Sequence, residues 1–185
     1  PACTGCRWLF GQFKPRALDG IEVWNGPWHR PRASNEASLQ IWYHWLSAGY
    51  RLPATAGSDG HRTTSYHRPG SGFNLIWADE LSADALLRGL RQGHVMLSSG
   101  PQLWIEASQP GCDVVIMGEA LRATSPTIQL HLRWLDAPAE ATVRLIADGY
   151  VQAEWPAVPT GERSVEALVV RCVGAELRDP QGTLL

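Results

Sequence analysis

The sequence predicts an α/β region over residues 1–100, followed by a β-sandwich-like region over residues 101–185. In the first region, apolar strand-like runs alternate with helical patterns, which is typical of βαβ units in a parallel sheet or barrel. From Gly100 onward the hydrophobic period falls to two residues, which indicates half-buried antiparallel strands. We therefore expect two domains that divide near residue 100.

The first βαβ unit is predicted from residue 19 to residue 56. Residues 19–26 alternate in polarity and close in an Asn-Gly-Pro turn, so they are expected to form a short strand. Ser34 is the predicted N-cap of the next helix, and Gly49 is its predicted stop. Residues 50–56 are predicted as the second strand. The helix carries a wide apolar face that consists of Ala37, Leu39, Ile41, Trp42, Trp45 and Leu46.

A second unit of the same kind is predicted from residue 73 to residue 98. Residues 73–78 and 94–98 are the expected strands, and residues 82–91 are the expected helix. Ser82 has the position of an N-cap and Gly93 that of a C-terminal glycine stop, so the limits of this helix are well marked.

The second region is predicted to consist of antiparallel strands. Residues 128–134 alternate between apolar and polar side chains, and Asp148-Gly149 is a strong signal for a two-residue hairpin turn. Further strands are expected over residues 103–107, 114–117, 143–147, 150–155 and 165–172.

The segment Ala56-Gly57-Ser58-Asp59-Gly60-His61 carries the main chemical signal. Asp59 and His61 are two residues apart, so on extended backbone both side chains point to the same side and to one place. They follow a predicted strand, and ligands of α/β folds gather at the carboxyl ends of strands. We therefore interpret Asp59 and His61 as metal ligands, although both residue types are also common in turns.

Three further residues are candidates for the same site. His67 lies in the loop that begins at Asp59 and is predicted to contact substrate or a metal-activated water, which makes it the catalytic candidate. Asn25 and Glu22 lie near the end of the first strand, where they are expected to contact substrate or to orient a metal ligand. For Asn25 a simple turn role before Gly26 is equally consistent with the sequence.

The order of several motifs resembles the C-terminal part of the PHP superfamily of metal-dependent phosphoesterases, and within it the CehA/McbA-type metallohydrolases. The resemblance covers about residues 1–120 and continues more loosely into the β-rich tail. The motifs that carry it are Asp19-Gly20-Ile21-Glu22-Val23-Trp24-Asn25-Gly26, Gly57-Ser58-Asp59-Gly60-His61, Leu81-Ser82, Ala85-Leu86-Leu87, Leu90-Arg91-Gln92-Gly93 and Ser98-Ser99-Gly100-Pro101.

The resemblance implies a fold and a chemistry. The fold is the C-terminal part of a distorted (β/α)7 barrel, and the chemistry is hydrolysis of a phosphoester, ester or carbamate bond by water that two or more Zn, Mn or Fe ions activate. Members of the family also use a His-x-His near the N-terminus and further His, Asp and Glu residues, none of which this chain matches. Because the sequence begins with Pro1 instead of Met, we expect the chain to be a fragment that is inactive by itself.

The remaining histidines and cysteines have simpler explanations. Cys3 and Cys6 form a Cys-x-x-Cys pair without a second pair, which favours ordinary cysteines over a zinc or redox site. The other imidazoles fall in loops, on a helix and on a polar strand face, where surface or structural roles are more common. They are His29, His44, His94 and His131.

Composition excludes several classes of function. A net charge of −2 without a Lys/Arg cluster argues against nucleic acid as a partner, and no apolar run approaches the roughly 20 residues of a membrane span. A small-molecule substrate is the expected partner, while the compartment and the oligomeric state are left open. Two other functions are consistent with the sequence: an inactive barrel remnant, and a glycan- or ligand-binding sandwich that uses Trp104 and Trp155.

Overall fold

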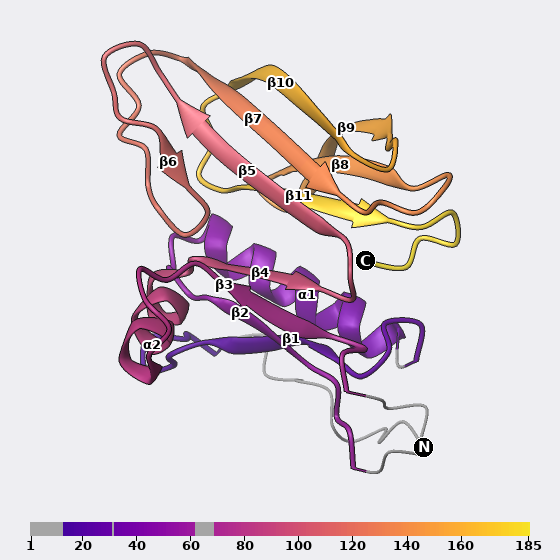
Figure 1. The fold of residues 1–185 in the computed structure, drawn as a ribbon. Coiled ribbons are helices and arrows are strands. Elements are labelled where there is room, and N and C mark those ends of the chain that lie inside the picture. Colours follow the sequence, from indigo (N-terminus) through magenta and orange to yellow (C-terminus); the bar gives the residue numbers. More distant parts are fainter. Residues whose placement is uncertain (1–12, 31, 62–68) are drawn as a thin grey trace.

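Two antiparallel sheets form a β-sandwich beside a smaller layer that contains both helices, in a computed structural model that describes residues 13–30, 32–61 and 69–185 (Figure 1). The smaller layer comprises β1 (Ile21–Asn25), α1 (Arg32–Ser47), β2 (Ala54–Gly57), β3 (Phe73–Ile76), α2 (Ala83–Gln92) and β4 (Val95–Ser98). The sandwich comprises β5 (Gln102–Ser108), β6 (Val115–Ile116), β7 (Thr127–Leu135), β8 (Thr142–Ala147), β9 (Tyr150–Pro156), β10 (Gly161–Leu168) and β11 (Val173–Arg178).

The prediction of an α/β fold that forms part of a (β/α)7 barrel is wrong. Most strands in the described ranges are antiparallel, and β1 and β2 form the single parallel pair there. The strands of the second expected βαβ unit, β3 and β4, pair antiparallel, with Phe73 opposite Ser98. A parallel partner would require the connecting helix to return the chain to the opposite end of the first strand. Instead the Trp77 N–H donates to the His94 carbonyl at 2.9 Å, so the chain returns at the end where it left.

The limits of α2 agree with the prediction. The Ser82 hydroxyl accepts a hydrogen bond from the Ala85 N–H at 3.2 Å, and Gly93 ends the helix in the left-handed region with φ of 78°. Glycine adopts that conformation at less cost than residues with a side chain. The helix therefore ends just before β4 begins. It connects β3 to β4 and lies at one end of this antiparallel pair.

The sandwich region contains antiparallel strands as the sequence predicts, but the strand predicted over residues 165–172 is misplaced and β11 was not predicted. Its sheets have the orders β10-β7-β5-β6 and β11-β8-β9. Asp148 and Gly149 have φ of 49° and 86° in the turn between β8 and β9, as the hairpin signal predicts. Residues 165–172 do not form one strand, because β10 ends at Leu168 and β11 begins at Val173.

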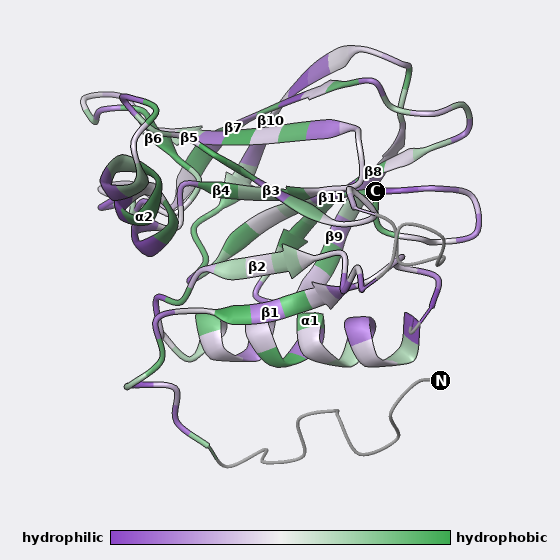
Figure 2. Ribbon diagram, turned by 60° about the horizontal axis from the view of Figure 1, so that its bottom comes forward, coloured by the Kyte–Doolittle hydropathy of each residue, from purple (hydrophilic) through white to green (hydrophobic). Residues whose placement is uncertain are grey.

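Two apolar cores hold the layers together. The first lies between the sheets of the sandwich and contains Leu132 and Val143, whose side chains are fully buried. The second lies between α1, β1 and β2 and contains Trp24, also fully buried. The sandwich strands alternate between hydrophobic and hydrophilic residues along their length (Figure 2), so each sheet gives one face to the core and one to solvent.

The face of helix α1 that is buried differs from the apolar face that the sequence predicts. Its buried residues are Asn35, Leu39, Tyr43 and Trp45, of which Asn35 and Tyr43 were not expected in the core. Residues 35, 39 and 43 lie four apart and form one row along the helix. This row is buried because part of α1 faces the sandwich as well as the β1–β2 pair, as the contact between Tyr43 and Glu176 on β11 shows.

A buried ion-pair network joins α1 to β11. The Tyr43 hydroxyl donates to Oε1 of Glu176 at 2.7 Å, and Nε of Arg178 donates to Oε2 of the same carboxylate at 2.6 Å. The Arg178 guanidinium also donates to both carboxylate oxygens of Glu36 and lies over the Trp28 ring, 5.8 Å from its centroid. One arginine thus neutralises carboxylates from two layers that are far apart in the sequence.

Burial and neighbouring charges shift the pKa values of two side chains in this network. Burial raises the pKa of the Tyr43 phenol well above its ordinary value of 10.0, and the Glu176 carboxylate raises it further. Burial alone would lower the pKa of Arg178, but its hydrogen bonds with Glu36 and Glu176 outweigh this effect and raise it. Tyr43 is therefore neutral and Arg178 charged in the folded protein near neutral pH.

The raised pKa of Tyr43 predicts a loss of stability in alkali. Above pH 10.0 the unfolded chain releases the Tyr43 proton while the folded protein retains it, so the free energy of unfolding falls as pH rises. We expect a smaller fall for Tyr43→Phe, which has no phenol to titrate there. Urea unfolding of both proteins from about pH 9 to about pH 11 measures the difference. Equal slopes in the two proteins would contradict the prediction.

Candidate functional site

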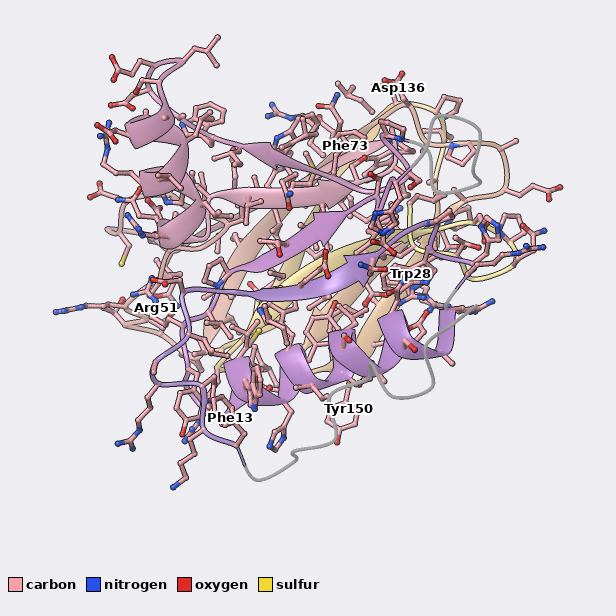
Figure 3. All side chains as sticks on the ribbon, turned by 90° about the horizontal axis from the view of Figure 1, so that it is seen from below. Phe13, Trp28, Arg51, Phe73, Asp136 and Tyr150 are labelled. Atoms are coloured by element: carbon pink, nitrogen blue, oxygen red, sulfur yellow. The ribbon has the colours of Figure 1, made fainter. Side chains whose placement is uncertain are left out.

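The carboxyl edge of the β1–β2 pair collects the polar residues that the sequence analysis singled out. Because the two strands are parallel, they end at the same edge, with Asn25 opposite Gly57. Glu22 and Asn25 come from β1, whereas Asp59 and His61 follow β2 directly. The edge lies beside Trp28, which follows β1 (Figure 3).

Asp59 and His61 lie in direct contact. Nε2 of His61 is 2.9 Å from Oδ1 of Asp59, with the two side chains 81% and 39% exposed respectively. The backbone at Asp59 is not extended, since its φ is 49°. A turn, and not the extended backbone predicted from the sequence, therefore brings the two side chains together. Carboxylate oxygen and imidazole nitrogen atoms are both ligand types that divalent cations such as Zn²⁺ bind.

Glu22 and Asn25 are neighbours at the same edge. The Asn25 side-chain amide donates to Oε2 of Glu22 at 3.3 Å. Oε1 of Glu22 lies 2.7 Å from the position that a Cβ atom would have at Gly57, so the carboxylate occupies the space beside that glycine. Because residue 57 is a glycine, the Glu22 carboxylate can lie over the end of β2, the strand that precedes Asp59.

Two asparagine side chains that the sequence analysis missed fix the backbone at this edge. The Asn35 amide, from α1, accepts from the Asn25 N–H at 3.1 Å and donates to the Asn25 carbonyl at 3.2 Å. The Asn74 amide, from β3, does the same for Ala56, at 2.8 and 2.9 Å. Each amide forms the pair of backbone hydrogen bonds that a neighbouring strand would form. No sequence pattern indicated this role, because Asn35 lies within a helix and Asn74 within a strand.

The described residues do not complete a metal centre by themselves. Across residues 13–30, 32–61 and 69–185, no group of three or more His, Cys, Asp or Glu side chains is placed to hold a metal ion. His67, Cys3 and Cys6 lie outside the described residues. A catalytic zinc usually has three protein ligands, so Asp59 and His61 alone would not be enough to hold one.

Apart from His29, which directly follows Trp28, the other described histidines lie outside β1, β2 and the residues that directly follow them. His29 and His44 are exposed. His94 contacts Oε1 of Glu119 at 3.5 Å, and Nδ1 of His131 lies 3.1 Å from the Ser164 hydroxyl, as expected for a histidine on the polar face of a strand.

Trp24 and Trp28 belong to the core. Trp24 is fully buried and Trp28 is 2% exposed, and their rings meet edge to face with centroids 5.1 Å apart. The Trp24 indole donates to the Gly26 carbonyl at 2.7 Å, which orders the turn after β1. The structure therefore supports a packing role for both rings.

Trp104 and Trp155 do not form an exposed aromatic platform on the sandwich. Both are partly buried, and each ring is covered by an arginine: Arg133 lies 5.3 Å from the Trp104 centroid and Arg163 lies 5.0 Å from the Trp155 centroid. Trp155 also packs against the sandwich core. This arrangement gives no support to glycan binding through these two rings.

Comparison of the chain with protein-family models, curated proteins and solved structures finds no match. Within the described part of the chain, neither helix combines the length and the apolar character needed to cross a membrane.

Proposed function

We propose that Asp59 and His61 are two ligands of a divalent metal site and that the protein is a metal-dependent hydrolase. The observation that carries the proposal is the 2.9 Å contact between Nε2 of His61 and Oδ1 of Asp59 at the carboxyl edge of β1 and β2. The resemblance of the surrounding motifs to PHP-type metallohydrolases supports the same chemistry. The proposal does not depend on a complete barrel, because it uses only the edge of this strand pair.

The chemistry assigns a role to each described residue at this edge. A bound Zn, Mn or Fe ion would lower the pKa of a water molecule and polarise the phosphoryl or acyl oxygen of a small-molecule substrate. Asp59 supplies a carboxylate ligand and His61 an imidazole ligand. Glu22 and Asn25, already hydrogen-bonded to each other, orient the substrate or a metal ligand. Further ligands would have to come from outside the described residues, and His67 keeps its proposed role toward substrate.

The amount of bound metal tests the proposed ligands directly. We expect the protein, expressed from its native reading frame with any flanking sequence, to retain divalent metal after dialysis. Asp59→Ala and His61→Ala should each weaken metal binding by more than the roughly 10- to 100-fold that loss of a supporting hydrogen-bond partner costs. Elemental analysis of the dialysed proteins, followed by titration with Zn and Mn, measures both effects.

His44→Ala is the matched control, because His44 is an exposed imidazole on α1 and away from the edge. It should leave metal content unchanged. Hydrolysis of p-nitrophenyl phosphate diesters, esters and carbamates by the metal-loaded protein then distinguishes the bond classes. A protein that retains its metal after both substitutions, or that binds none, would show that the proposed ligands are wrong.

A further inference from the structure

A large cavity lies where the sandwich meets the smaller layer. It has a volume of about 810 Å³ and lies where β5 and β11, from opposite sheets, open toward α1, β2 and β4. This volume falls in the range of roughly 300 to 1,000 Å³ that is typical of small-molecule sites. The cavity is separate from the edge that carries Asp59 and His61, because neither residue lines it.

The body of the cavity is apolar. Side chains from α1, β4, β5 and β11 line it, and examples from these four elements are Leu46, Leu97, Ile105 and Ala175. The Trp42 indole, which also lines the cavity, uses its N–H to donate to the Leu52 carbonyl at 2.7 Å, so it presents mainly its apolar ring. Such a surface favours an apolar ligand over water.

Arginines lie around this apolar body. Arg51, Arg91 and Arg171 all belong to the lining and all are exposed, and each precedes a strand of the cavity wall: β2, β4 or β11. Figure 3 shows Arg51 at the end of the molecule opposite to Trp28, hence far from the candidate metal edge. In the described part of the chain, the side chains of Arg91 and Arg171 form no hydrogen bond or ion pair.

The carboxylates of the lining already have partners. Glu119 accepts from the Ile116 N–H at 3.0 Å and lies beside His94. Glu176 is bound by Tyr43 and Arg178. The cavity therefore offers unpaired positive charge, and its electrostatic complement is an anion.

The wall near the arginines is tightly packed. A Cβ atom at Gly118 would lie 2.4 Å from the Gln92 carbonyl oxygen, so the turn after β6 lies directly against the end of α2. Arg51 reinforces this contact through a hydrogen bond of 2.8 Å from its guanidinium to the Gly118 carbonyl. A preformed wall lowers the entropic cost of binding a ligand.

We propose that this cavity binds an elongated apolar molecule that ends in a carboxylate, such as a medium-chain fatty acid. The chain occupies the space between β5, β11 and α1, and the carboxylate is bound by Arg91 and Arg171. Arginine suits this role because its planar fork matches a carboxylate. This binding site is independent of the proposed hydrolytic function.

Calorimetric titration with three ligands that share one alkyl chain tests the proposal. We expect decanoate to bind saturably, with a negative change in heat capacity from burial of the chain. Decanol should bind more weakly, and decyltrimethylammonium should bind at least about tenfold more weakly than decanoate. The double variant Arg91→Gln/Arg171→Gln should weaken decanoate binding about tenfold and leave decanol binding unchanged.

Arg88→Gln is the matched control. Arg88 lies on α2, as Arg91 does, but it is paired with Asp79 at 3.5 Å and does not line the cavity. It should bind decanoate like the unsubstituted protein. Ala175→Phe should fill the cavity and abolish binding of all three ligands, with thermal unfolding as the check that it folds. The proposal is overturned if decanoate shows no saturable binding up to about 1 mM, if the cationic ligand binds equally well, or if the double variant behaves like Arg88→Gln.

Discussion

Arg178→Met is expected to lower the free energy of unfolding by about 3 to 5 kcal/mol, because it removes the one cation from a buried network and leaves its carboxylates uncompensated. Arg178 and Glu176 are each 5% exposed, and Glu36 is bound by the same guanidinium. Methionine is apolar and of comparable length, so loss of charge is the main change. Urea unfolding at neutral pH measures the effect.

Two further variants separate loss of charge from loss of packing. Arg88→Met, at an exposed arginine paired with Asp79, should change stability by no more than about 0.5 kcal/mol. Adding Glu36→Gln and Glu176→Gln to Arg178→Met should restore at least about half of the lost stability, because the unpaired charges are gone. No recovery in the triple variant would mean that Arg178 stabilises the protein through packing against Trp28 and not through charge.

Trp24→Ala is expected to cost about 3 to 5 kcal/mol, the range for removal of a buried aromatic side chain. The Trp24 side chain is fully buried between α1 and β1, meets the Trp28 ring edge to face, and donates to the Gly26 carbonyl. Glycine at residue 72 leaves room for its indole, since a Cβ there would lie 2.8 Å from the indole nitrogen. Chemical unfolding followed by circular dichroism gives the measurement.

The control for this variant is Trp77→Ala, at a tryptophan that is 64% exposed. It should lower stability by about 0.5 kcal/mol or less. A cost for Trp24→Ala as small as that of the control would show that Trp24 does not contribute to the core.

Several local signals in the sequence predicted local structure well, although the predicted N-cap Ser34 lies inside α1. Ser82 and Gly93 cap α2 as expected, because capping depends on a side-chain oxygen and a left-handed glycine within one turn of helix. Asp148-Gly149 forms the expected turn for a similar reason, since both residues tolerate positive φ. The alternation over β7 gave the correct inner face, with Leu130 and Leu132 buried.

Pairing between distant segments could not be predicted in the same way. An apolar run looks alike whether its partner strand is parallel or antiparallel, which is why β3, α2 and β4 were interpreted as a βαβ unit. The contact of Glu36 with Arg178 joins residues separated by 142 positions, and no local pattern reports it. The end of β10 and the start of β11 were missed because residues 165–172 are mostly apolar and contain no glycine or proline to mark the turn.

The candidate site was predicted in part. Spacing brought Asp59 and His61 to attention, and the structure places them in contact. Their roles as ligands stay a prediction. The contributions of Gly57, Asn35 and Asn74 were not visible in the sequence, because each acts on the backbone or on the space around another residue. Sequence patterns report what a residue type tends to do by itself, whereas these three depend on which neighbour the fold supplies.

The two asparagine amides have a consequence for self-association. A two-stranded sheet leaves peptide groups on its outer edges free to recruit a strand from another molecule, which is a common start of aggregation. Asn35 occupies both backbone groups of Asn25 on β1, and Asn74 occupies both of those of Ala56 on β2. Each amide thus blocks an edge of the pair with a single side chain. An intruding strand would have to displace two hydrogen bonds at each of these positions before it formed its first, so the two amides oppose extension of this small sheet.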